Sequence, residues 1–240
     1  MFYCKIYGER NSGTNFLKSL IEKNFPKSTY GRWDGNKVIN NKYYFWKHGP
    51  PRNYLRGNKE NKLVTKIFIV RNLEKWLVSM FHNPYHVKRT NDFESFLFNK
   101  MQIENKDEVY LNNRFINSDD VNKTIFELRY YKYQKIKEYC NINENIILVN
   151  LDYIQNDENC IQFLKEINNI YKLNKTKFST IEKHSKNSKN MKNIEYKTNY
   201  KDYQSTIDLY KNVEIENEIN NLTYYIKMTD ESISTIQSKI

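Results

Sequence analysis

The chain has 240 residues, of which 15% are aromatic and 28% charged, and its formal net charge is +11. This length and aromatic content predict one domain over residues 1–240 with a sizeable core, and the positive charge favours phosphate- or sulfate-bearing partners. No apolar run approaches the roughly 18 residues of a membrane span, and the N-terminus lacks a signal-peptide pattern, so we expect a soluble, intracellular, cytoplasmic protein.

Cysteines and known binding signatures exclude several further classes. The three cysteines are widely spaced, without the spacing of a metal site or a disulfide framework, which fits a reducing compartment. No helix-turn-helix, zinc-finger or RNA-binding signature accompanies the basic charge, so nucleic acid is not expected as the main partner.

The predicted elements alternate between strands and helices. A β-rich run at 2–7 precedes a glycine-containing turn and an amphipathic helix over 15–24, and strands are predicted at 43–46 and 64–70. Further helices are predicted from Arg71-Asn72 to near Pro84, from a capped start at 90–94 to Phe98, and over 121–140. A buried strand at 146–149 and a helix over 157–171 follow, whereas the last forty residues receive no firm assignment.

This alternation predicts an α/β fold with a central, mostly parallel sheet flanked by helices in three layers. In such sheets, ligands bind at the carboxyl ends of the strands. The basic segment 183–193 is predicted to be either a mobile loop that closes over a ligand or a solvated linker.

The turn after the first strand has the spacing of a phosphate loop. Gly8 and Gly13 match the glycines of G-x-x-x-x-G-K-[ST], but Thr14 and Asn15 stand where the lysine and the Ser/Thr would be. The segment is therefore predicted to bind an anion through its backbone amides, without the groups that cut a nucleoside triphosphate. The alternative is an ordinary polar turn.

A second anion site is predicted after the strand at 64–70. Arg71 follows that strand, and Ser79 lies eight residues later, about two helical turns on, so both side chains can face one ligand. A strand-terminal arginine paired with a carboxylate is the alternative.

Together the two segments resemble the sulfotransferase family that uses 3′-phosphoadenylyl sulfate as donor. Residues 9–17 look like its 5′-phosphosulfate loop, commonly [KR]-[ST]-G-T-[TSN]-x-L, and residues 70–79 look like its 3′-phosphate motif with the same Arg-to-Ser separation. Residues 151–154 are similar to a later acidic-and-leucine element. The resemblance implies a P-loop-type fold and a transfer that needs no metal, with adenosine 3′,5′-bisphosphate as product.

The resemblance also implies roles for individual residues. The 5′-phosphate and sulfate would be held by the first loop, and the 3′-phosphate by the second segment; the donor-binding residues are Arg10, Asn11, Ser12, Gly13, Thr14, Asn15, Arg71 and Ser79. Asn11 departs from the pattern, because the family has its catalytic Lys or Arg at this position. Arg10 or another cation such as Lys47 would then stabilise the charge on the bridging oxygen, unless activity is low or Arg10 is a structural ion pair.

His48 is the candidate base. It follows the predicted strand at 43–46 and would lie at the same sheet edge, where a histidine can take the acceptor's proton near neutral pH; a structural role is the alternative. His82 and His86 have helical spacing, but Pro84 between them disfavours a metal site.

The sequence therefore predicts a sulfotransferase that transfers a sulfuryl group to a hydroxyl or amine of a small-molecule or carbohydrate acceptor. One alternative is a nucleoside or nucleotide kinase with an aberrant loop. The other is an inactive nucleotide- or nucleic-acid-binding protein.

Overall fold

The structure is a computed structural model that describes residues 2–26, 28–29, 48, 51, 64–84, 90, 92–100, 123–181 and 200–228. The predicted strand at 43–46, the basic segment 183–193, Lys47 and His86 lie outside these residues.

Four described strands form one open sheet in the order β1 (Cys4–Gly8), β2 (Thr65–Val70), β3 (Ile146–Asn150) and β4 (Tyr224–Lys227). The first three are parallel, with Ile6 opposite Ile67 and Ile67 opposite Ile147, and β4 is antiparallel to β3. All residues of β1, β2 and β3 are buried, as expected for a parallel sheet covered on both faces. The predicted α/β class with a mostly parallel sheet is confirmed.

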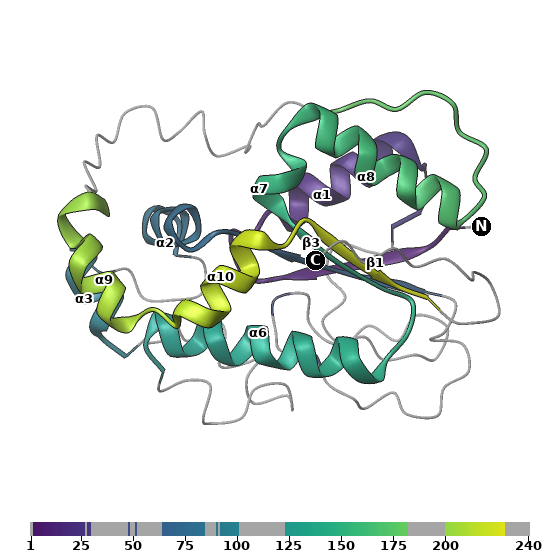
Figure 1. The fold of residues 1–240 in the computed structure, drawn as a ribbon. Coiled ribbons are helices and arrows are strands. Elements are labelled where there is room, and N and C mark those ends of the chain that lie inside the picture. The colour runs from purple at the N-terminus through teal and green to yellow at the C-terminus, as the bar shows by residue number, and fades with distance from the viewer. Residues whose placement is uncertain are drawn as a thin grey trace, which may run out of the picture.

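Helices lie on both faces of this sheet (Figure 1). One face packs against α1 (Thr14–Asn24), α7 (Leu151–Ile154) and α8 (Asp157–Ile170), and the other against α6 (Ile125–Ile142) and α10 (Val213–Asn221). Alternate strand residues supply the two cores, because Ile6 faces α1 and α8 whereas Tyr7 faces α6. This arrangement is compatible with a three-layer fold.

A third apolar cluster lies off the carboxyl ends of the parallel strands, on the left in Figure 1. It joins α2 (Leu73–His82), α3 (Phe93–Phe98) and α9 (Gln204–Tyr210) to the first half of α6, and a short 3-10 helix at Tyr200–Tyr203 precedes α9. The loops after β1 and β2 are therefore covered from outside by α2.

Helix starts follow local capping chemistry. The α6 helix begins at Ile125, later than the predicted 121, because Thr124 and Glu127 form a reciprocal capping box there. The predicted capped start near residue 92 is confirmed, since the Asp92 side chain accepts a hydrogen bond from Ser95 N.

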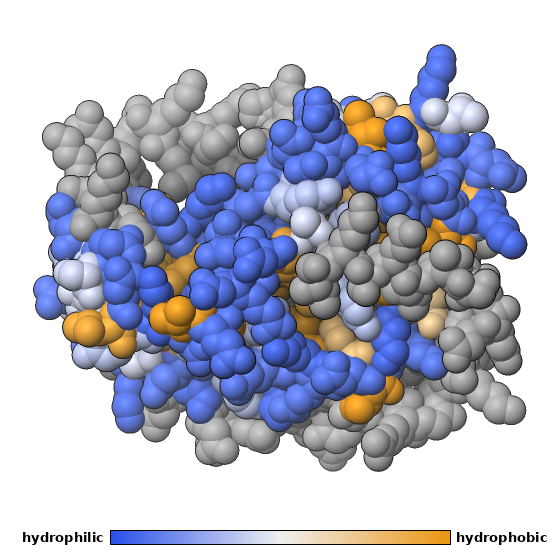
Figure 2. Space-filling view, viewed as in Figure 1, coloured by the Kyte–Doolittle hydropathy of each residue, from blue (hydrophilic) through white to orange (hydrophobic). Residues whose placement is uncertain are grey.

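The face of the molecule in Figure 2 is mostly hydrophilic, with small separate hydrophobic areas. Among the described residues, the exposed large hydrophobic side chains are Ile142, Leu209, Tyr210 and Val213. Within the described part of the chain, no helix combines the length and the apolar character needed to span a membrane.

Candidate functional site

The segment between β1 and α1 forms a tight turn. Both the backbone amide and the hydroxyl of Ser12 donate to the carbonyl oxygen of Glu9, at 3.2 and 2.7 Å. Asn11 has φ 59° and Gly13 has φ 96°, so the chain enters the left-handed region twice within three residues. Asparagine and glycine are the residues that adopt this conformation most readily.

Close packing also requires both glycines of this segment. A Cβ atom on Gly8 would lie 2.5 Å from the carbonyl oxygen of Ile69, and one on Gly13 would lie 2.7 Å from Leu151 Cδ1. The loop after β1 is therefore pressed against the ends of β2 and β3, at the carboxyl edge of the sheet.

The N-terminus of α1 opens onto this edge. Gly13 is its N-cap and supplies no side-chain cap, and the carbonyl of Gly13 accepts from Leu17 N at 2.9 Å. In an α-helix the amides of the first turn point along the axis away from the helix, which makes a helix N-terminus suited to an anion. Thr14 is buried in this turn, whereas Asn15 is exposed.

Asn11 connects the two segments that the sequence singled out. Its side-chain amide donates to the carbonyl oxygens of Ser79 and Asn83, at 3.2 and 3.0 Å, at the C-terminal end of α2. Its own carbonyl oxygen accepts from Arg71 Nη1 at 3.1 Å. The Arg71 side chain and the carbonyl oxygen of Ser79 thus both contact Asn11 in the first loop.

Arg71 is only partly engaged by this contact. Burial lowers the pKa of its guanidinium, and the nearby Asp152 carboxylate acts in the opposite direction. Its Nε is buried and has no hydrogen-bond partner among the described residues. Arg71 therefore has donor capacity left for a ligand anion.

The Asp152 carboxylate accepts two hydrogen bonds from residues at the start of α2. One carboxylate oxygen accepts from the backbone amide of Asn72 at 2.9 Å, and the other accepts from Lys75 Nζ at 2.8 Å. Asn150 supports this arrangement, since its side chain accepts from Asp152 N and donates to Asn72 Oδ1. The acidic element at 151–154 thus binds the N-cap residue of α2 and lies near Arg71.

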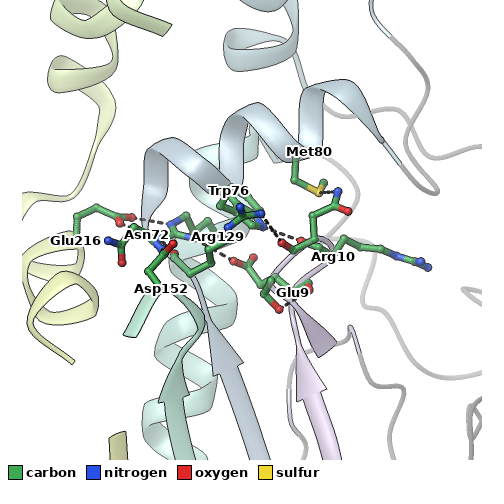
Figure 3. Close-up of polar contacts among 11 residues, drawn as sticks. Glu9, Arg10, Asn72, Trp76, Met80, Arg129, Asp152 and Glu216 are labelled. Carbon is green, nitrogen blue, oxygen red and sulfur yellow. Dashed lines mark hydrogen bonds and ion pairs between the residues drawn. The ribbon is translucent and has the colours of Figure 1, made fainter. Parts of the chain in front are cut away.

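A buried ion cluster lies behind the two loops (Figure 3). Arg129, 1% exposed, donates to both carboxylate oxygens of Glu216 at 2.7 and 2.8 Å and to Glu9 Oε2 at 3.3 Å. Its guanidinium also lies over the Trp76 ring, 4.9 Å from the centroid. Burial raises the pKa of the Glu9 carboxyl although Arg129 opposes the shift, and Glu9 Oε1 has no hydrogen-bond partner among the described residues.

The sequence reasoning missed this cluster, although one signal was present. Arg129 lies four residues from both Ile125 and Tyr133, which are buried, so it occupies the core-facing stripe of α6. A charged side chain on such a stripe needs a buried partner.

The two candidate catalytic residues both lie near the carboxyl end of β1. His48 is buried and its Nδ1 lies 2.7 Å from the carbonyl oxygen of Gly8. A carbonyl only accepts, so Nδ1 carries a proton and Nε2 is the basic nitrogen of the neutral ring. The carbonyl of Arg10 accepts from Trp76 Nε1 at 2.8 Å, and its side chain extends away from Glu9 and Arg129 (Figure 3).

No protein-family model, curated protein or solved structure matches the chain. Among the described residues, no three His, Cys, Asp or Glu side chains form a group able to hold a metal ion.

Proposed function

We propose that the carboxyl edge of the sheet is a P-loop-type nucleotide site and that the protein is a sulfotransferase using 3′-phosphoadenylyl sulfate. The observation that carries the proposal is the contact of Asn11 with both Arg71 and the Ser79 carbonyl, beside an α1 N-terminus that lacks a side-chain cap. Two anion-binding elements joined through one residue would suit a nucleotide with phosphate at both the 5′ and 3′ positions.

The residues present fit such a donor. The first-turn amides of α1, at Thr14 and Asn15, would hold the 5′-phosphate and sulfate, with Gly13 allowing close approach. Arg71, through its Nε, and Ser79 would hold the 3′-phosphate. The Ser12 hydroxyl closes the turn in this conformation and would shape the loop that faces the ligand.

When bound, the donor would supply a sulfuryl group and leave as adenosine 3′,5′-bisphosphate. His48 Nε2 would accept the proton of the acceptor hydroxyl or amine as the new bond to sulfur forms. Arg10 would turn its guanidinium toward the breaking bond and stabilise the negative charge on the bridging oxygen. None of these roles requires a metal, and the acceptor class remains small molecule or carbohydrate.

Calorimetric titration with adenosine 3′,5′-bisphosphate tests the nucleotide site. Wild type is expected to bind without Mg²⁺, and Arg71→Ala to bind at least about tenfold more weakly, since a charge-assisted phosphate contact is lost. Lys137→Ala, which removes a cation from an exposed pair with Glu218, is the matched control and should bind as wild type. The proposal fails if wild type does not bind or if Arg71→Ala binds equally well.

A nucleotide-binding protein without transfer activity is the second candidate. Asn11 favours this second candidate. The sulfotransferase family would have a catalytic cation at this position of the loop, whereas the Asn11 amide is neutral and is bonded to the end of α2. Sulfur-labelled donor, offered with a panel of hydroxyl and amine acceptors in the presence of a chelator, separates the candidates. Labelled product that falls in His48→Ala and Arg10→Ala supports transfer, whereas nucleotide binding without product in wild type supports the second candidate.

A further inference from the structure

Behind the candidate site, the buried side chain of Arg129 bonds to three other elements. It comes from α6, yet each of its partners lies on another element: Glu216 on α10, Glu9 after β1, and the carbonyl oxygen of Arg71 after β2, which accepts from Nη2 at 2.8 Å. One guanidinium therefore bonds to the residue that opens the first anion loop and to the residue that carries the second anion site.

The Trp76 ring extends these contacts. It lies against the Arg129 guanidinium, and its Nε1 donates to the carbonyl of Arg10. Arg129 thus reaches the first loop twice, directly through Glu9 and through the ring that holds Arg10. The loops after β1 and β2 share this side chain as a common support.

Only arginine has the geometry for these contacts. Its Nε and Nη2 bind Glu216 as a planar fork, while Nη1 and Nη2 bind Glu9 and the Arg71 carbonyl. Lysine carries the same charge but lacks this fixed fork. Since buried ion pairs are often no more stabilising than apolar residues of similar volume, the cluster is weak evidence for a purely stabilising role.

We infer that Arg129 is a positioning residue that sets the placement of the Arg71 site relative to the first anion loop. Through this placement it determines the preference for a nucleotide phosphorylated at both ends over one with a 5′-phosphate alone. The inference rests on the proposed nucleotide site.

The test compares two ligands, adenosine 3′,5′-bisphosphate and adenosine 5′-monophosphate, by calorimetry in wild type and Arg129→Lys. Wild type is expected to prefer the bisphosphate by at least about tenfold, and Arg129→Lys to reduce that ratio to near one while staying folded. A residue that only stabilised the fold would leave the ratio unchanged. Lys137→Arg on the same helix is the control and should keep the wild-type ratio.

A neutral triple variant covers the case in which Arg129→Lys unfolds. Glu9→Gln with Arg129→Met and Glu216→Gln removes all three charges and leaves no buried charge unpaired. It is expected to fold and to show the same loss of ratio. A wild-type ratio in either folded variant overturns the inference, and failure of wild type to bind either nucleotide overturns the proposed function with it.

Discussion

The α1 and α2 helices both begin at the carboxyl edge of the parallel sheet, and neither N-cap residue supplies a side-chain cap. They differ in what lies at the N-cap: the amide of Asn72, the N-cap residue of α2, donates to the Asp152 carboxylate. The N-cap of α1 is Gly13, with φ 96°. Because a carboxylate already lies beside the start of α2, we expect an anion to be held by the backbone at α1 and by the Arg71 side chain after β2.

The acidic residues beside these helices differ in the same way. Both carboxylate oxygens of Asp152 accept hydrogen bonds, whereas only one oxygen of Glu9 does so among the described residues. Incompletely satisfied buried groups tend to occur at functional sites rather than in purely structural regions. By this criterion, the loop after β1, which carries Glu9, is a stronger candidate for a functional site than the segment around Asp152.

The largest effect is expected from Gly13→Ala. An alanine there adopts φ near 96° and meets Leu151 Cδ1 at 2.7 Å, so the start of α1 must shift. We expect a loss of about 1–3 kcal/mol in the free energy of unfolding and loss of detectable bisphosphate binding. Urea unfolding and calorimetry measure the two effects.

Asn174→Ala is the control for this change, because Asn174 has φ 56° in an exposed segment away from the site. It should be destabilised by its positive φ and still bind the nucleotide. Normal binding by Gly13→Ala would show that the start of α1 is not an anion site.

The second-largest effect is expected at Asn11, which connects the loop after β1 to the end of α2. Asn11→Gly keeps the φ of 59° without strain and removes the amide that holds α2. We expect a loss of about 1 kcal/mol in unfolding free energy and about tenfold in bisphosphate affinity, since the end of α2 is released from the loop while Arg71 keeps its bond to the backbone carbonyl of residue 11. Asn174→Gly makes the same substitution at a similar φ and should change neither quantity appreciably; equal affinities in the two variants would contradict the bridging role.

Glu9→Gln tests the incompletely satisfied acid. Burial raises the pKa of Glu9 in the folded state, so the unfolded chain releases this proton at a lower pH and wild-type stability falls as pH rises through that window. Glutamine lacks this titration, so the variant should become more stable relative to wild type as pH rises through that window. Urea unfolding at several pH values checks this, with the exposed Glu158→Gln as control; parallel curves for Glu9→Gln and wild type would refute the account.

Asp152→Asn should have the smallest effect. It removes the negative charge that lies beside the start of α2. The side-chain oxygen can still accept from Asn72 N, but the negative charge near Arg71 is removed. Bisphosphate affinity is expected to rise about threefold, with under about 1 kcal/mol change in stability. Asp157→Asn removes the same charge from the first turn of α8 and should leave bisphosphate affinity unchanged. A fall in affinity in Asp152→Asn would show that the Asp152 charge does not oppose anion binding at Arg71.

Much of the fold was predictable because its signals are local. The β-branched run of β2, the glycine spacing before α1 and the apolar periodicity of α8 each reflect neighbouring residues. β4 was not predictable, since Ile226 is its only buried residue and gives no clear alternation. The last strand can therefore be recognised only from its pairing with β3 in the structure.

The candidate site was predictable only in part for a related reason. The sequence predicted roles for Arg71 and Ser79 from local spacing, but the acceptors of the Asn11 amide lie 68 and 72 residues away, and Glu216 lies 87 residues from Arg129. Such contacts depend on the tertiary fold, and no local pattern encodes them. The role of Asn11 as a bridge therefore emerged only with the structure.

Phosphorus NMR of adenosine 3′,5′-bisphosphate tests most directly whether the two regions form one nucleotide site. The account predicts that both phosphorus resonances shift on addition of wild-type protein, and that Arg71→Ala retains the 5′ shift while losing the 3′ shift. Neither resonance shifting in wild type, or both responding equally to Arg71→Ala, would contradict it.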